Sequence, residues 1–520
     1  MNYHKLLTIL VLLAVSCQKQ QSTENTSQPE KTTTKKPNII IFYVDDLGYG
    51  DVSSYGATLV NTPNIDKLAD NGLKMTDAHC SAATCTPSRY SLLTGSYAFR
   101  NKAAILPGDA PLIIDTTMAT IPSMLKKTGY NTAVVGKWHL GLGDGTLNWN
   151  NEIKPGPIEV GFDYCFLIPA TGDRVPCVYV ENHQIVGLEA NDPLTVSYEG
   201  PIDDEPKAFE HPELLRYASD RQHSDDIING VGRIGYMSGG NKALWVDEEF
   251  PDILTQKSKE FIQKNKDNPF FLFYSFHDIH VPRLPHPRFE GKTEMGPRGD
   301  AIVQMDWCVG EIVNQVEALG IAENTLIIFT SDNGPVLNDG YEDLAVEKLG
   351  KHSPAGPFRG GKYSAFEAGT RVPTIAYWPG KIQPKESSAL FSQVDLFTSL
   401  AKLTQTAVEN NDAPDSFNLL PVLLGESEKG REMLIEESVL VLSLRKDQWK
   451  YIPPTEKEAP WMIDKGIEGG FQTTPQLYDL SKDIGEQENV ADQFPEIVKE
   501  MDAQLKIIET AKGTRQGFGL

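Results

Sequence analysis

The stretch that decides the fold is NIIIFYV, Asn38–Val44, which is followed at once by two aspartates. A continuous run of β-branched and aromatic residues is typical of a strand that is buried on both faces. Similar runs recur at 131–135, 270–276, 326–329 and 374–377, with helical patterns at 122–127 and 301–319. Strands that alternate with helices predict an α/β fold with a doubly wound, mostly parallel sheet.

Ionisable and polar residues come directly after four of these predicted strands. They are Asp45, Asp46, Lys137, His139, His280, Asp332 and Asn333. Each alone could be a solvated turn or a structural side chain, but in such a sheet ligands bind beyond the carboxyl ends of the strands. Carboxylate and amide oxygens suit a hard cation such as Ca²⁺ or Mg²⁺ rather than zinc. The sequence therefore predicts a functional site with a metal at this edge.

A second signal is CTPSRYSLLTG at 85–95. Pro87 suits the first turn of a helix, which would place Cys85 just ahead of a helix N-terminus. That N-terminus and Arg89 would both stabilise an anion beside the cysteine. The structural alternative is a buried capping segment, and an unmodified thiol could also act as a nucleophile. Lys362 follows two glycines, where a cation could approach a ligand closely.

Composition narrows the classes of function. The 520 residues allow a large core, and the net charge of −23 argues against a nucleic-acid partner. An anionic substrate would therefore need a local cationic pocket. Four further cysteines, which no CxxC spacing pairs, leave the disulfide question open: Cys80, Cys165, Cys177 and Cys308.

The first residues are expected to direct export. We interpret 1–16 as a signal peptide, Cys17 as a lipidated residue within a lipobox-like LAVSC, and 17–36 as a flexible tether. A plain secretory signal with an incidental cysteine is the alternative. The prediction is a periplasmic or outer-membrane-anchored lipoprotein of a Gram-negative bacterium, with membrane contact only through its lipid. Residues 37–428 would form the catalytic domain, and 429–520 a C-terminal subdomain with a small antiparallel sheet and a terminal helix.

The stretch at 85–95 matches the C-x-P-S-R-x-x-x-L-T-G signature of the type I, formylglycine-dependent sulfatases. The blocks PNIIIFYVDDLGYGD, GYNTAVVGKWHLG, TSDNG, RVPTIAYWPG and LYDL occur in family order, so the chain resembles bacterial carbohydrate sulfatases and arylsulfatase A-like enzymes from about residue 38 to 511. The resemblance implies an alkaline-phosphatase-like fold. It also implies a maturation enzyme that oxidises Cys85 to Cα-formylglycine (3-oxoalanine).

The resemblance also assigns roles to individual residues. One Ca²⁺ would be held by Asp45, Asp46, Asp332, Asn333 and the modified Cys85. Arg89, Lys137 and Lys362 would bind the modified residue and the sulfate. One hydroxyl of the hydrated aldehyde would attack sulfur, and His280 would protonate the leaving alcohol. His139 would then deprotonate the second hydroxyl to release sulfate. His280 is preferred to His277 because it alone has the H-x-P context.

The substrate implied is a sulfated glycan, with sulfated galactose or N-acetylgalactosamine units. Asp173 and Arg174 would contact sugar hydroxyls, and His183 and the segment 192–242 are weaker candidates. Thr171 and Gly172 stand where some family members carry serine and histidine. Two alternatives are a phosphate or phosphonate ester hydrolase of the same superfamily and an unmatured, Ca²⁺-dependent glycan-binding lipoprotein.

Overall fold

The computed structural model of the protein describes residues 35–518. The predicted signal peptide, Cys17 and nearly all of the tether lie outside the described residues and stay predictions. Within residues 35–518, no helix is long and apolar enough to cross a lipid bilayer.

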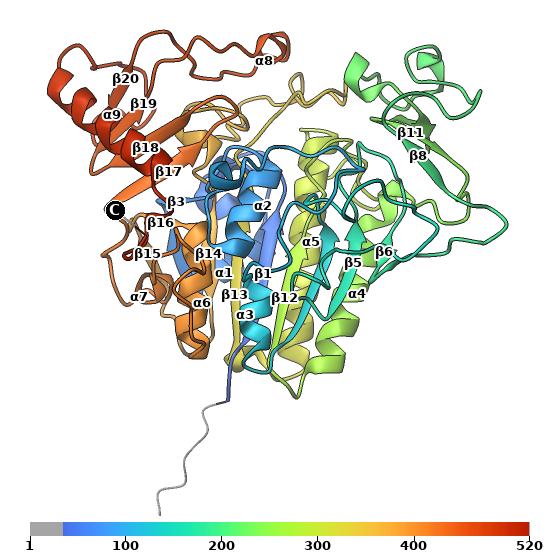
Figure 1. Ribbon diagram of the computed structural model, residues 1–520, viewed down its shortest axis with the longest axis horizontal. Helices are drawn as coiled ribbons and strands as arrows, with labels where there is room; N and C mark the ends of the chain where they lie inside the picture. Colours follow the sequence, from blue (N-terminus) through green and yellow to red (C-terminus); the bar gives the residue numbers. More distant parts are fainter. Residues whose placement is uncertain (1–34, 519–520) are drawn as a thin grey trace, which may run out of the picture. The chain divides into compact units, whose positions relative to one another are not determined.

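The centre of the molecule is a ten-stranded sheet in the order β15-β2-β14-β13-β1-β12-β4-β5-β6-β7 (Figure 1). The five strands in the middle run parallel: β13 (Thr325–Ser331), β1 (Asn38–Val44), β12 (Phe270–Ser275), β4 (Asn131–Lys137) and β5 (Tyr164–Ile168). Shorter strands extend both edges through antiparallel pairings: β14 (Thr374–Tyr377), β2 (Leu73–Met75), β6 (Val180–Glu181) and β7 (Gln184–Ile185). At the outermost position β15 (Lys385–Ser387) pairs with β2 in parallel. The prediction of a mostly parallel, doubly wound sheet is confirmed.

β1 lies between β13 and β12, with Ile39 opposite Leu326 on one side and Phe271 on the other. All seven of its residues are buried. A strand with neighbours on both edges and helices over both faces has no exposed side, which explains why its sequence does not alternate.

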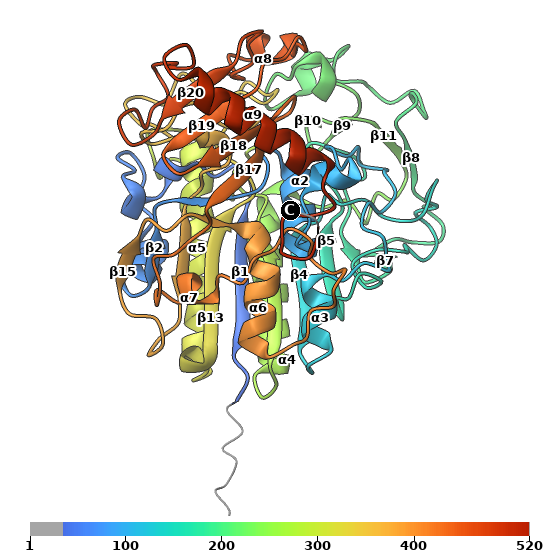
Figure 2. The same cartoon turned by 60° about the vertical axis from the view of Figure 1, so that its left-hand side comes forward.

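Helices cover both faces of this sheet (Figure 1 and Figure 2). One group that packs together is α1 (Pro63–Asp70), α4 (Phe250–Asn265) and α5 (Pro297–Ala318). The other is α2 (Cys85–Thr94), α3 (Ile121–Lys126) and α6 (Leu396–Thr404). The predicted helices at 122–127 and 301–319 are thus present, although α5 begins four residues earlier, at Pro297.

The start of α2 differs from the sequence prediction. Cys85 is the first residue of the helix rather than the residue ahead of it, and Pro87 occupies the third position. A proline is still tolerated there because the first four N–H groups of a helix have no partner within the helix. Every residue of α2 is buried, so this helix lies inside the molecule rather than on its surface.

The C-terminal part forms a second, four-stranded antiparallel sheet. Its strands follow chain order: β17 (Met433–Glu437), β18 (Leu442–Lys446), β19 (Trp449–Ile452) and β20 (Gln476–Asp479). The terminal helix α9 (Pro495–Thr510) contacts β18 and β19. The short helix α7 (Leu420–Leu423) precedes this sheet. A second short helix, α8 (Pro460–Asp464), lies in the connection between β19 and β20. The smaller antiparallel subdomain predicted from the sequence is present.

The cysteines among residues 35–518 are all free and buried. Cys80, Cys165, Cys177 and Cys308 therefore form no disulfide with one another, and the question left open by the sequence is answered.

Candidate active site

A cavity of about 570 Å³ opens beyond the carboxyl ends of the parallel strands. Six of the predicted site residues line it: Cys85, His139, Asp173, Arg174, His280 and Lys362. They come from five separate stretches of sequence that the sheet topology brings to one edge. The other predicted metal ligands, together with Arg89 and Lys137, form the buried cluster described next.

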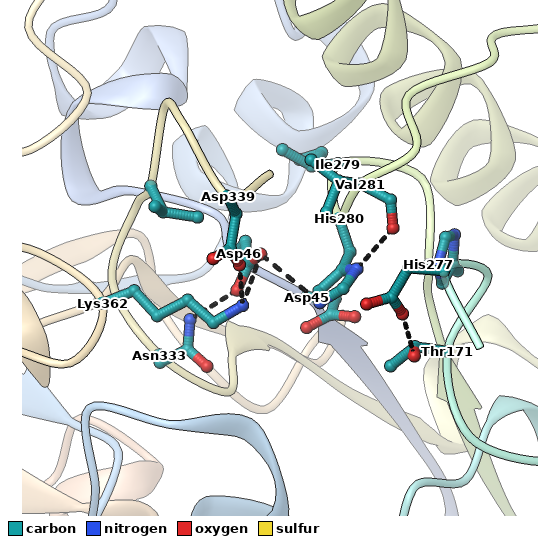
Figure 3. Close-up of polar contacts among 12 residues, drawn as sticks. Asp45, Asp46, Thr171, His277, Ile279, His280, Val281, Asn333, Asp339 and Lys362 are labelled. Atoms are coloured by element: carbon teal, nitrogen blue, oxygen red, sulfur yellow. Dashed lines mark hydrogen bonds and ion pairs between the residues drawn. The ribbon is translucent and has the colours of Figure 1, made fainter. Parts of the chain in front are cut away.

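The cluster consists of buried side chains with carboxylate or amide oxygens at the ends of β1 and β13 (Figure 3). Asp45 and Asp46 follow β1, and Asp332 and Asn333 follow β13; all four are fully buried. The amide of Asn333 donates to Oδ1 of Asp46 at 2.7 Å, and the backbone N–H of Asp46 donates to Oδ1 of Asp332 at 3.3 Å. These bonds join three of the predicted metal ligands, and the fourth, Asp45, directly precedes Asp46 in the chain.

Arg89 and Lys137 neutralise one side of this cluster. The Arg89 guanidinium lies 2.9 and 2.7 Å from Oδ2 of Asp332 through Nε and Nη2. Nζ of Lys137 lies 2.5 Å from Oδ2 of Asp45. Arg89 also donates to the backbone carbonyl of Lys137 at 3.2 Å, which links helix α2 to the end of β4.

Lys362 neutralises the other side. Its Nζ lies 3.0 Å from Oδ2 of Asp46 and 2.9 Å from Oδ2 of Asp339 (Figure 3). The glycine before it has a structural purpose that the sequence did not show: a Cβ on Gly361 would lie 2.3 Å from the carbonyl oxygen of Pro335. Glycine therefore allows the lysine segment to pack directly against the loop that carries Asn333.

The charge balance of the cluster fits a divalent cation. Burial and the neighbouring carboxylates raise the pKa of Asp332 to about 7, and burial raises the pKa of Asp46 despite Lys362. Oδ1 of Asp45 and Oδ1 of Asn333 are buried oxygens without a hydrogen-bond partner among residues 35–518. Although burial alone would raise it, Lys137 holds the pKa of Asp45 well below its ordinary value, so positive charge is unevenly distributed in the cluster. The unsatisfied buried oxygens are what a bound cation would satisfy. The donor set contains oxygens of the kind that Ca²⁺ prefers.

Cys85 lies at the bottom of the cavity at the N-terminus of α2, and only 2% of its surface is exposed. Burial raises the pKa of its thiol even though Lys137 and Lys362 act to lower it. An unmodified Cys85 would therefore be protonated at neutral pH, and a protonated thiol is a weak nucleophile. The position of Cys85 in the cavity suits a nucleophile, but its unmodified thiol would be a poor one.

His139 has a tautomer that its surroundings fix. Its Nε2 lies 3.0 Å from the carbonyl oxygen of Leu106, which can only accept, so Nε2 carries the proton. Nδ1 is buried without a partner in the described part of the chain. Burial, reinforced by Lys137 and Arg174, holds the pKa of His139 well below its ordinary value. The ring is therefore neutral and presents a free lone pair.

His280 is fixed in the opposite sense. Its Nδ1–H donates to the carbonyl oxygen of Val281 at 2.7 Å, and its Nε2 lies 3.9 Å from Oδ2 of Asp46 (Figure 3). Nε2 is thus the atom that can exchange a proton in the cavity. His277 instead accepts a hydrogen bond from the backbone N–H of Gly172 at 2.7 Å and is absent from the cavity lining.

Asp173 and Arg174 form one wall of the cavity and pair with each other at 2.8 Å. His223, from the segment 192–242, lies 3.3 Å from Asp173 through Nε2 and 2.7 Å from Asp220 through Nδ1. His183 bonds Glu159 at 2.9 Å and lies outside the lining.

The sequence reasoning missed several residues of the cavity: Asp339, Tyr363, Trp461 and Lys465. Tyr363 follows Lys362 directly and Asp339 lies six residues after Asn333, so proximity to the motifs was the available signal. Trp461 and Lys465 come from the C-terminal subdomain, and no feature of the sequence connects them with Cys85.

A model of the sulfatase family matches residues 37–406. The chain belongs to the sulfatase family. It is 49% identical to an N-acetylgalactosamine-6-O-sulfatase of Bacteroides thetaiotaomicron over 98% of this chain and 99% of that protein. It is 30% identical to human arylsulfatase A over 93% of this chain and 90% of that protein. A solved structure from work on glycosaminoglycan metabolism by B. thetaiotaomicron superposes with a TM-score of 0.90 at 51% identity, covering 92% of this chain and 100% of that one.

Membership of this family makes the chain a sulfuric ester hydrolase, as the signature at 85–95 indicated. The prediction of the family, of its alkaline-phosphatase-like fold and of the enzyme class is confirmed.

Proposed function

We propose that this sulfatase removes sulfate esters from glycans, and that 6-O-sulfated N-acetylgalactosamine is its preferred residue. The observation that carries the proposal is the cavity at Cys85, in which cations and neutral histidines surround the first residue of a buried helix. The relative that acts on N-acetylgalactosamine 6-O-sulfate matches nearly the whole chain at 49% identity, and this supports the choice of sugar and position.

Cys85 is proposed to be oxidised to formylglycine by a maturation enzyme, and the hydrated aldehyde then supplies the hydroxyl that attacks sulfur. Asp45, Asp46, Asp332 and Asn333 are proposed to hold Ca²⁺, which supplies positive charge against the sulfate oxygens. The raised pKa values of two of these carboxyls and the unsatisfied oxygens of the other two residues support this assignment.

The chain's own residues divide the remaining work. Lys137 and Lys362 provide fixed positive charge at the sulfate end, where preorganised charge stabilises a transition state most effectively. Arg89 positions Asp332 and the end of β4 rather than contacting the cavity.

Each of the two histidines is proposed to transfer a proton through one of its ring nitrogens. Nδ1 of His139 has a free lone pair and can accept a proton near Cys85. Nε2 of His280 faces the cavity and can donate to the leaving sugar oxygen once an anionic sulfate has favoured the protonated ring. Asp173 and Arg174 are proposed to hydrogen-bond sugar hydroxyls. Export as a lipoprotein through residues 1–16 and Cys17 also remains part of the proposal.

The test is sulfate release by the protein co-produced with a formylglycine-generating enzyme. The panel contains N-acetylgalactosamine 6-sulfate and 4-sulfate, galactose 6-sulfate, N-acetylglucosamine 6-sulfate and N-acetylgalactosamine 6-phosphate. We expect the highest kcat/KM on the first. Faster turnover of another sulfate would correct the sugar or the position, and turnover of the phosphate alone would favour the phosphate or phosphonate hydrolase alternative.

A further inference from the structure

A long connection in the C-terminal subdomain reaches the catalytic cavity. It joins the end of β19 at Ile452 to the start of β20 at Gln476 and contains α8. In Figure 1, α8 lies beyond the carboxyl ends of the parallel strands. Two residues of this connection, Trp461 and Lys465, line the same cavity as Cys85.

The connection is held in place from both sides of the cavity. Nζ of Lys465 lies 2.8 Å from Oδ2 of Asp220, which belongs to the segment 192–242. Close by, the backbone N–H of Ala365 donates to the carbonyl oxygen of Gly469 at 2.9 Å. These contacts anchor Lys465 and the chain at Gly469 to two separate parts of the catalytic unit.

Trp461 offers an apolar ring at the cavity. Its indole packs edge-on against Tyr363, with ring centroids 4.9 Å apart and an interplanar angle of 88°. The Tyr363 hydroxyl donates to Asp339 at 3.1 Å, and Asp339 in turn pairs with Lys362 at the sulfate end. The indole is nevertheless 38% exposed. A rigid and partly exposed aromatic ring beside a polar cavity suits stacking against the C–H face of a sugar ring.

Lys465 lies where the catalytic cavity adjoins a second hollow. This hollow of about 330 Å³ shares two lining residues with the cavity, Lys362 and Lys465. Lys362 is engaged by Asp46 and Asp339 at the sulfate end, whereas Lys465 has Asp220 as its carboxylate partner. That partner is shared with His223 at 2.7 Å. Lys465 therefore places a positive charge where the catalytic cavity meets the second hollow.

Resting on the function proposed above, we propose that Trp461 and Lys465 form an outer subsite for the sugar next to the sulfated one. Trp461 stacks against the ring of this neighbouring sugar, and Lys465 binds an anionic group on it, either a carboxylate or a second sulfate. The preferred substrate is then an acidic oligosaccharide rather than a free sulfated monosaccharide.

The test compares kcat/KM for four substrates on each preparation. They are the 6-O-sulfated monosaccharide and the same sugar linked to a neutral, a uronic acid or a sulfated neighbour. The wild type should favour the two acidic disaccharides. Trp461→Ala should lower the ratio of disaccharide to monosaccharide kcat/KM by roughly tenfold, as truncation of a buried aromatic anchor does at other binding sites. This ratio does not depend on the fraction of enzyme that is folded or matured.

Lys465 is tested by its charge. Lys465→Met should remove the preference for acidic over neutral neighbours, and Lys465→Arg should retain it. The acidic disaccharide whose kcat/KM falls most in Lys465→Met identifies the group that Lys465 binds. Ile463 lies in α8 between Trp461 and Lys465, is 79% exposed and lines neither hollow, so Ile463→Ala is the matched control and should leave both ratios unchanged.

A binding measurement separates this inference from catalysis. A desulfated acidic disaccharide should change the tryptophan fluorescence of the wild type, and Trp461→Phe should abolish that change. Equal kcat/KM for the wild type on monosaccharide and disaccharides, or a fluorescence change that survives Trp461→Phe, would overturn the outer subsite while sulfate release still supports the proposed function. Absence of sulfate release from every sugar would overturn both.

Discussion

Asp339 is the residue through which the buried cation Lys362 can be tested most sharply. Nζ of Lys362 lies 2.9 Å from Oδ2 of Asp339 and 3.0 Å from Oδ2 of Asp46, and all three side chains are buried. Substitution of Asp339 by asparagine removes one of the two negative partners without changing the size of the side chain. It leaves Lys362 paired with Asp46 alone.

The magnitude follows from the loss of one buried partner. Removal of one member of a buried ion pair costs about 3–5 kcal/mol. Because Lys362 keeps Asp46, and because asparagine keeps an oxygen acceptor, we expect Asp339→Asn to lower the free energy of unfolding by about 2 kcal/mol at pH 7. Activity should fall as well, since Lys362 would be drawn towards Asp46. A tenfold loss of kcat/KM would correspond to about 1.4 kcal/mol of transition-state stabilisation.

The stability difference between wild type and Asp339→Asn should depend on pH in a defined direction. Burial alone would raise the pKa of Asp339, but Lys362, and to a lesser extent Lys465, hold it below its ordinary value. A carboxyl with a lowered pKa adds stability that is present above its pKa in the unfolded chain and is lost as the pH falls. The difference in unfolding free energy between wild type and Asp339→Asn should therefore be constant between pH 7 and about pH 5 and shrink below about pH 4.

The assay is urea unfolding of both proteins across this pH range, combined with sulfate release at pH 7. Glu342 lies on the same loop but is exposed, so Glu342→Gln removes an equal charge and should change neither quantity. Equal unfolding free energies for wild type and Asp339→Asn at pH 7 would refute the reasoning.

Three further predictions concern Cys85, the metal and the C-terminal sheet. Cys85→Ser should abolish turnover because a serine supplies one hydroxyl where the proposed hydrated aldehyde would supply two; sustained release of many sulfates per enzyme would contradict this. Chelation by EDTA should lower both Tm and activity and added Ca²⁺ should restore both, since the proposed ion would satisfy the buried oxygens of Asp45 and Asn333 that have no hydrogen-bond partner among residues 35–518; a Tm that is insensitive to chelator and Ca²⁺ would argue against the site. Arg445→Met should lower the free energy of unfolding by about 3–5 kcal/mol, because this buried residue of β18 pairs with Asp77 at 2.6 Å and Glu367 at 3.3 Å. The neighbouring Lys446 forms an exposed pair, so Lys446→Met should cost less than about 1 kcal/mol; equal losses in urea unfolding would contradict the buried network.

The parallel sheet could be predicted because its strands are buried on both faces and therefore appear as unbroken apolar runs. The topology then placed residues from distant parts of the chain at one edge, which is why Asp45 and Asn333 could be grouped before the structure was known. Sequence alone did not reveal where α2 begins. Its first residue is Cys85 rather than the residue after it, because the proline is tolerated at any position of the first turn.

Other features depend on tertiary contacts that leave no local signal. The proton on Nε2 of His139 is fixed by the carbonyl of Leu106, 33 residues away. Trp461 reaches the cavity only because a hairpin of the second sheet carries a long connection. The two glycines before Lys362 were expected to let its cation approach a ligand, and the close contact of Gly361 with the backbone at Pro335 could not be predicted. The hydrogen-bond partners and cavity-lining residues that come from distant segments therefore could not be predicted from the sequence.

The central claim is that catalysis depends on oxidation of Cys85, and one measurement tests it directly. The protein is produced with graded amounts of a formylglycine-generating enzyme, and the fraction of Cys85 converted is measured from the mass of its peptide. Sulfate release from N-acetylgalactosamine 6-sulfate is then measured on each preparation. The account predicts a specific activity that rises linearly with conversion and extrapolates to zero at zero conversion. Full activity in a preparation whose Cys85 remains a thiol would contradict it.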